Sequence, residues 1–183
     1  MIVELALSLV LQQGAAAFAD LPHVTVRTYV VQGREPRQVR AAVNAARPVA
    51  GDGQGRDAAT QWTYGVRWMN DGSGACLPDT AEVTYAVTVT LPELGDEARL
   101  NAQATERWNA WSAYLAAHER RRVEGIVDGL AAMQAAMRAA PDCAAMTARR
   151  DEAIQAIAQH GQALDQALAE QYRRDRRRLP TFP

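Results

Sequence analysis

The feature that most constrains the fold is a helical periodicity that begins near Asp96 and continues almost to the end of the chain. It predicts one helix over about residues 97–139 and a second over about 143–177. Pro141 cannot continue a helix and Asp142 is a good N-cap, so the two helices are expected to separate there. Because the connection is so short, the helices must be antiparallel neighbours. The sequence therefore predicts a long helical hairpin.

The residues before this hairpin predict a small β-sheet. Apolar residues alternate with polar ones over 23–31, 60–69 and 81–91, which is typical of half-buried strands. A short helix is predicted over about 35–47, with Pro36 in its first turn. A glycine-rich turn joins the second and third strands, so we expect a small antiparallel sheet of about three strands. The predicted class is α+β: this sheet and one short helix, followed by the helical hairpin.

The composition excludes several classes of protein. A chain of 183 residues with 48% hydrophobic and 22% charged residues is typical of one globular domain, which we place over residues 20–183. The formal net charge of -1 gives no general affinity for nucleic acid or for an anionic membrane. Five arginines over 173–178 have the charge to bind lipid phosphates, nucleic acid or an acidic partner, but we attribute them to the helix dipole, which favours cations at a C-terminus. No stretch has the length and apolar character of a transmembrane segment.

Residues 1–19 have the outline of a secretory signal peptide. A short apolar run is followed by small residues that end in Ala17-Phe18-Ala19, which is an A-x-A cleavage pattern. Glu4 stands where such a signal carries cations, and the alternative is an amphipathic helix that stays attached. We expect the signal, and with it a secreted or periplasmic protein.

Cys76 and Cys143 are the two cysteines of the chain. In an exported protein such a pair is most simply a disulfide, and closing the long loop between them would stabilise the fold by about 4 kcal/mol. In the cytosol they would be two buried thiols. Their separation excludes a local C-x-x-C metal or redox motif.

The stretch AYLAAHERRRVEGIV, residues 113–127, differs by one letter from the zinc-protease motif H-E-x-x-H. In that motif two histidines one helical turn apart hold the metal, and the glutamate is the general base. His118 and Glu119 are present, but the fifth position is Arg122. Arg122 falls within the apolar stripe of its helix, so its guanidinium needs an acceptor, and Glu119 is the nearest candidate. A guanidinium offers no lone pair and cannot replace a histidine ligand.

Several other segments resemble, in order and spacing, a bacterial family of predicted secreted zinc-dependent proteases known as domain of unknown function 922. The resemblance covers roughly residues 24–179. Its most specific part is W-x-x-Y-x-x-x-H-E, here Trp111, Tyr114, His118 and Glu119. The other matching segments are VTVRTYVVQG, TQWTYGVRW, VTYAVTVTLPEL, the two cysteines and YRRDRRR.

The resemblance implies that His118 is a zinc ligand, Glu119 the general base and position 122 the second ligand. A further histidine of the family falls near Arg178 and is absent here. The paired cysteines agree with the family's layout. Because Arg122 and Arg178 stand at two expected metal positions, we expect no bound cofactor, and zinc only if the site is functional after all.

Other residues do not predict a rebuilt site. His23 and His160 are the remaining histidines, and Asp151, Glu152 and Asp165 are available oxygen donors, but none stands at a spacing that predicts a ligand. No serine lies in a nucleophile elbow and no glycine-rich phosphate loop follows a strand, so the sequence supports neither a serine hydrolase nor nucleotide binding.

We therefore expect an exported metalloprotease-like domain that is catalytically impaired and keeps a cleft for a peptide or an envelope protein. One alternative is an active metallopeptidase in which His118 and a different set of ligands hold zinc and Glu119 is the base. The other is a structural or interaction protein of the cell envelope. The sequence predicts neither the oligomeric state nor the partner.

Overall fold

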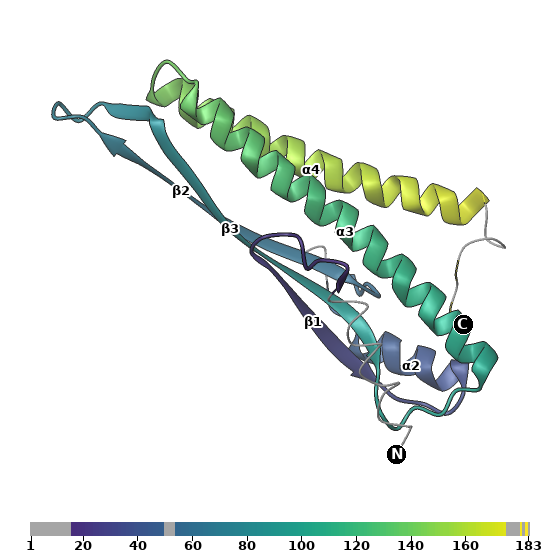
Figure 1. Ribbon diagram of the computed structural model, residues 1–183. Helices are drawn as coiled ribbons and strands as arrows, with labels where there is room; N and C mark the ends of the chain where they lie inside the picture. The colour runs from purple at the N-terminus through teal and green to yellow at the C-terminus, as the bar shows by residue number, and fades with distance from the viewer. Residues whose placement is uncertain (1–15, 50–53, 175–179, 181, 183) are drawn as a thin grey trace. The chain divides into compact units, whose positions relative to one another are not determined.

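The computed structural model describes residues 16–49, 54–174, 180 and 182 (Figure 1). The elements follow in the order β1 (Val24–Val31), α2 (Pro36–Ala46), β2 (Ala59–Asn70), β3 (Cys76–Leu94), α3 (Ala102–Arg138) and α4 (Cys143–Arg174). The three strands form one sheet, and the long helices follow it in the chain. The predicted α+β class is confirmed.

The chain divides into two compact units. The first holds the described residues of 1–61, 87–121 and 177–183, and the second holds those of 62–86 and 122–176. β2, β3 and α3 each contribute one end to each unit. Throughout the described residues, no helix has both the length and the apolar character required to cross a membrane.

The sheet has the strand order β1-β3-β2. β1 runs parallel to β3, in a register that places Val24 opposite Val87 and Val31 opposite Leu94. The prediction that β1 belongs to an antiparallel sheet is therefore wrong. Between β1 and β3 the chain passes through α2 and β2, which is long enough for the crossover that a parallel pair requires. β2 and β3 are joined by residues 71–75 alone, and a connection this short permits only the antiparallel pairing that was predicted.

The core of the first unit surrounds the N-terminal part of α3. Val39 and Val43 of α2 are fully buried in one cluster with Val31 of β1, Trp108 and Trp111 of α3, and Phe182. The ring of Trp108 meets Phe182 edge-on, with centroids 5.1 Å apart. α2 begins at Pro36, as predicted. This cluster fixes α3 two turns before His118 and Glu119.

In the second unit α3 and α4 run side by side in opposite directions (Figure 1). The connection is the predicted one, because Asp142 Oδ1 accepts a hydrogen bond from the Ala145 amide at 2.8 Å and caps α4. Gln134 Oε1 accepts the Val83 amide at 2.8 Å, and Arg138 Nε donates to the Ala81 carbonyl at 2.7 Å, so α3 also holds the β2–β3 hairpin. The stripe of α3 that is buried in this unit consists of Val123, Ile126, Leu130, Met133 and Met137.

The predicted disulfide is present in the second unit. It joins Cys76, the first residue of β3, to Cys143, the first residue of α4, with Cα atoms 5.8 Å apart and a sequence separation of 67. The tip of the strand hairpin is therefore tied covalently to the turn of the helical hairpin.

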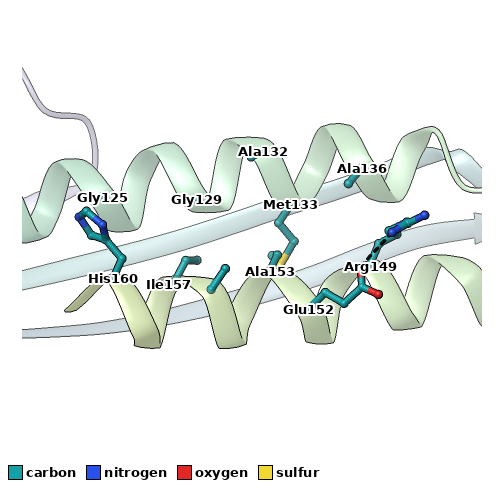
Figure 2. A pocket seen from close by; sticks show the side chains of 11 residues that line it. Gly125, Gly129, Ala132, Met133, Ala136, Arg149, Glu152, Ala153, Ile157 and His160 are labelled. Atoms are coloured by element: carbon teal, nitrogen blue, oxygen red, sulfur yellow. Dashed lines mark hydrogen bonds and ion pairs between the residues drawn. The ribbon is translucent and has the colours of Figure 1, made fainter. Parts of the chain in front are cut away.

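Two glycines of α3 set its distance from α4. The His160 ring lies over Gly125, and the Ile157 side chain lies against Gly129 (Figure 2). A Cβ added at either glycine would come closer than van der Waals contact to the opposing side chain. The helices approach as closely as they do because these positions lack side chains.

Gly129→Ala should therefore destabilise the protein although alanine is the better helix former. The propensity gain is about 1 kcal/mol, and overpacking against the buried Ile157 costs about 1 to 3 kcal/mol. We expect a net loss of about 1 kcal/mol in the free energy of unfolding, measured by urea denaturation. Gly161→Ala on α4 is the matched control, because its Cβ would meet only Arg122 Nη1 at 3.8 Å. This control should gain about 1 kcal/mol, and a Gly129 variant that gained as much would contradict the proposed packing.

Candidate functional site

His118 and Glu119 are both buried in the first unit, with 6% and 4% of their surfaces exposed. A buried carboxylate needs hydrogen-bond donors. Thr60, the second residue of β2, donates its hydroxyl to Glu119 Oε2 at 2.6 Å. The glutamate that the motif assigns to proton transfer therefore also ties α3 to the sheet. Thr60 could not be predicted as a partner of Glu119, because no local sequence pattern relates residues 59 positions apart.

The rest of the W-x-x-Y-x-x-x-H-E stretch continues the same side of α3. Trp111 is buried in the core cluster, with its ring centroid 5.1 Å from that of Trp108. Tyr114 lies one turn further along, and burial raises the pKa of its hydroxyl. His118 follows after one more turn. The motif thus extends from the hydrophobic core to the buried histidine, and its Trp111 contributes to the packing of the core.

Arg120 binds the segment that precedes β1. Its Nη1 and Nη2 atoms donate to the two carboxylate oxygens of Asp20, each at 2.7 Å, and Nη1 also donates to the Ala17 carbonyl. The hydrogen bonds from Arg120 lower the pKa of Asp20 to about 2. Phe18 is buried, with 3% of its surface exposed. Cleavage after Ala19 would remove Phe18 and the Ala17 carbonyl from these contacts, and cleavage itself stays a prediction.

Arg122 lies in the second unit and forms an ion pair with Asp165 of α4 through Nη2 and Oδ1. The two side chains are 18% and 33% exposed, so the pair is largely withdrawn from water. The acceptor required for an inward guanidinium is thus provided by the neighbouring helix. The sequence identifies Asp165 only as an available oxygen donor, because spacing within one helix gives no information about which residue of another helix it faces. A contact between Arg122 and Glu119 stays a prediction.

The side chain of Arg122 does not fit the role of a zinc ligand. Position 122, where the motif requires a lone pair, carries a permanently protonated guanidinium that already binds Asp165. Within residues 16–49, 54–174, 180 and 182, no three His, Cys, Asp or Glu side chains gather closely enough to hold a metal ion. Arg178, where the resemblance places a further histidine, is outside the described residues.

The remaining histidines have other surroundings. His23 is exposed just before β1, with a φ of 58°, and its carbonyl accepts the Val87 amide at 3.0 Å. His160 is exposed on α4, where its ring covers Gly125 (Figure 2).

A groove of about 500 Å³ runs between α3 and α4 in the second unit (Figure 2). Its walls are formed mainly by glycine and alanine residues of both helices, together with Met133, Ile157 and His160. Arg149 Nη1 and Glu152 Oε2 form an ion pair at 2.9 Å at one end, and His160 lies at the other. The small residues along it are Gly125, Gly129, Ala132, Ala136, Ala153 and Ala156.

Comparison with protein families matches residues 26–174 to a family described as bacterial protein of unknown function, DUF922. The chain belongs to the DUF922 family. The match begins in β1 and ends at the last residue of α4, so DUF922 covers every element named above, and Arg178 lies beyond it. The resemblance found in the sequence is confirmed to this extent. Comparison with curated proteins and with solved structures gives no match.

Proposed function

We propose that this DUF922 chain is an exported metalloprotease-like domain that has lost peptide hydrolysis and acts by binding a peptide or an envelope protein. The observation that carries the proposal is the ion pair between Arg122 and Asp165. A stray arginine at a former ligand position would leave an uncompensated charge on the inward face of α3. Here the opposing helix supplies a carboxylate, so the fold accommodates the arginine.

The surroundings of Glu119 support the same proposal. A general base must reach the proton that it removes, directly or through one water. Glu119 is 4% exposed and one of its oxygens accepts the Thr60 hydroxyl. In the proposed role this carboxylate serves the packing of α3 against β2, and His118 beside it is a buried remnant of the ligand set.

The disulfide supports the exported location. Disulfides persist in oxidising compartments and are rare in the bacterial cytosol. Cys76 and Cys143 are paired across 67 positions, and the described residues contain no free cysteine. A secreted or periplasmic location agrees with this pairing and with the signal-like residues 1–19.

A peptidase assay with a mixed peptide library tests the loss of hydrolysis. The wild-type protein, Glu119→Gln and His118→Ala should all show the same background, unaffected by EDTA. Glu106→Gln is the matched control, since Glu106 is an exposed glutamate of the same helix. EDTA-sensitive cleavage that Glu119→Gln and His118→Ala abolish and Glu106→Gln retains would contradict the proposal and establish an active metallopeptidase with a different set of ligands.

A further inference from the structure

β2 is an edge strand of the sheet. In the order β1-β3-β2 it has β3 on one side, and no strand among the described residues pairs with its other side. Residues 62–70 of β2 belong to the second unit. An edge strand presents a row of backbone N–H and C=O groups that can pair with another extended chain.

This edge lacks the features that usually prevent such pairing. Monomeric proteins protect edge strands with charged residues, prolines or short length. Residues 62–70, WTYGVRWMN, contain no proline and one charged residue, Arg67, whose Nε donates to Glu82 Oε2 on β3 at 2.7 Å. Large apolar side chains are instead exposed: Tyr64 by 40%, Trp68 by 39% and Met69 by 62%. A surface of this kind is typical of an interaction site.

We propose that the occupant of this edge is a second copy of the chain, with the two β2 strands paired antiparallel about a two-fold axis at Val66. The sequence around Val66 is self-complementary. Tyr64 lies as far before Val66 as Trp68 lies after it, so each copy places its Tyr64 opposite Trp68 of the second copy. These two cross-strand aromatic pairs lie on one face, because residues two apart share a face of a strand. Pairing joins the two β2–β3 hairpins into one continuous sheet.

The single charge of the strand selects this register. With the axis at Val66, Arg67 lies opposite Gly65 of the second copy, where no side chain opposes it, and it remains bound to Glu82. With the axis at Arg67, the two Arg67 side chains would face each other, and like charges directly opposite destabilise a strand pair. With the axis at Gly65, two glycines would meet at the centre and the Tyr64–Trp68 pairs would be lost.

Cysteine crosslinking of the full chain tests the register. Directly opposite residues in an antiparallel pair have Cα atoms about 4.5 to 5.5 Å apart, which is within disulfide range. Val66→Cys should therefore give a covalent dimer under mild oxidation. Thr63→Cys is the matched control, because Thr63 would lie opposite Met69 and should give no covalent dimer. Equal crosslinking of the two variants, or none for Val66→Cys, would overturn the proposal.

Sedimentation over a range of concentrations tests the surface itself. The wild-type chain should dimerise, and Tyr64→Lys with Trp68→Lys should raise the dimer Kd by about tenfold or more. Val49→Lys is the matched control for an exposed apolar residue, since Val49 is 63% exposed and lies in the first unit. Circular dichroism verifies that each variant is folded. The proposal would be overturned if the wild type is a monomer at every concentration or if the double variant still dimerises. It would also be overturned if the β2 edge pairs only with segments of other proteins.

Discussion

Replacing both cysteines with alanine should lower the free energy of unfolding by about 4 kcal/mol, since the disulfide closes a loop across 67 positions. The bond lowers the conformational entropy of the unfolded chain, and this entropy loss grows slowly with loop length. The double variant Cys76→Ala, Cys143→Ala is the correct comparison, because either single variant leaves a reactive thiol. Urea denaturation of the two proteins measures the difference.

The wild-type protein in a strong reducing agent serves as the control and should lose the same stability as the double variant. A loss under about 1 kcal/mol in both cases would mean that the crosslink hardly constrains the unfolded chain. The stabilisation expected from a disulfide in an exported protein would then be absent.

Asp165→Leu should lower the free energy of unfolding by about 2 kcal/mol, because it leaves the Arg122 guanidinium without the carboxylate that opposes it. Breaking a fully buried ion pair costs about 3 to 5 kcal/mol. The value expected here is smaller because the Asp165 side chain is 33% exposed and water can reach the arginine after the change.

The double variant Arg122→Met, Asp165→Leu should recover most of this loss. Removing both charges also removes their desolvation cost, and replacing an ion pair by apolar residues of similar size is often neutral. A double-mutant cycle by denaturation gives the coupling between the two residues. Strictly additive effects would show that Asp165 does not compensate the charge of Arg122. The ion pair would then no longer support the proposed loss of function.

The elements of this fold could be predicted from sequence where their signals are local. The break between the long helices was placed correctly because a proline and an N-capping aspartate act within one turn, and Asp142 Oδ1 indeed binds the Ala145 amide. The strand hairpin could be predicted because its turn residues adjoin its strands. The inward position of Arg122 was also predicted, since helical periodicity determines which residues share a face, and its side chain is 18% exposed.

What could not be predicted depends on partners that are distant in the chain. Alternation identifies β1 as a strand but carries no information on direction, so its parallel pairing with β3 was missed. Periodicity places Glu119 and Arg122 on the inner part of α3 but does not show which residues face them. Thr60 and Asp165 are defined only by packing between elements.

The zinc content of the natively purified protein shows whether the metal site inferred from the motif has been lost. The protein should be prepared without chelators, incubated with excess zinc, passed through a desalting column and measured by mass spectrometry of the metal. We expect far less than one zinc per chain for the wild type, and the same amount for His118→Ala. One tightly held zinc per wild-type chain that His118→Ala loses would contradict this expectation.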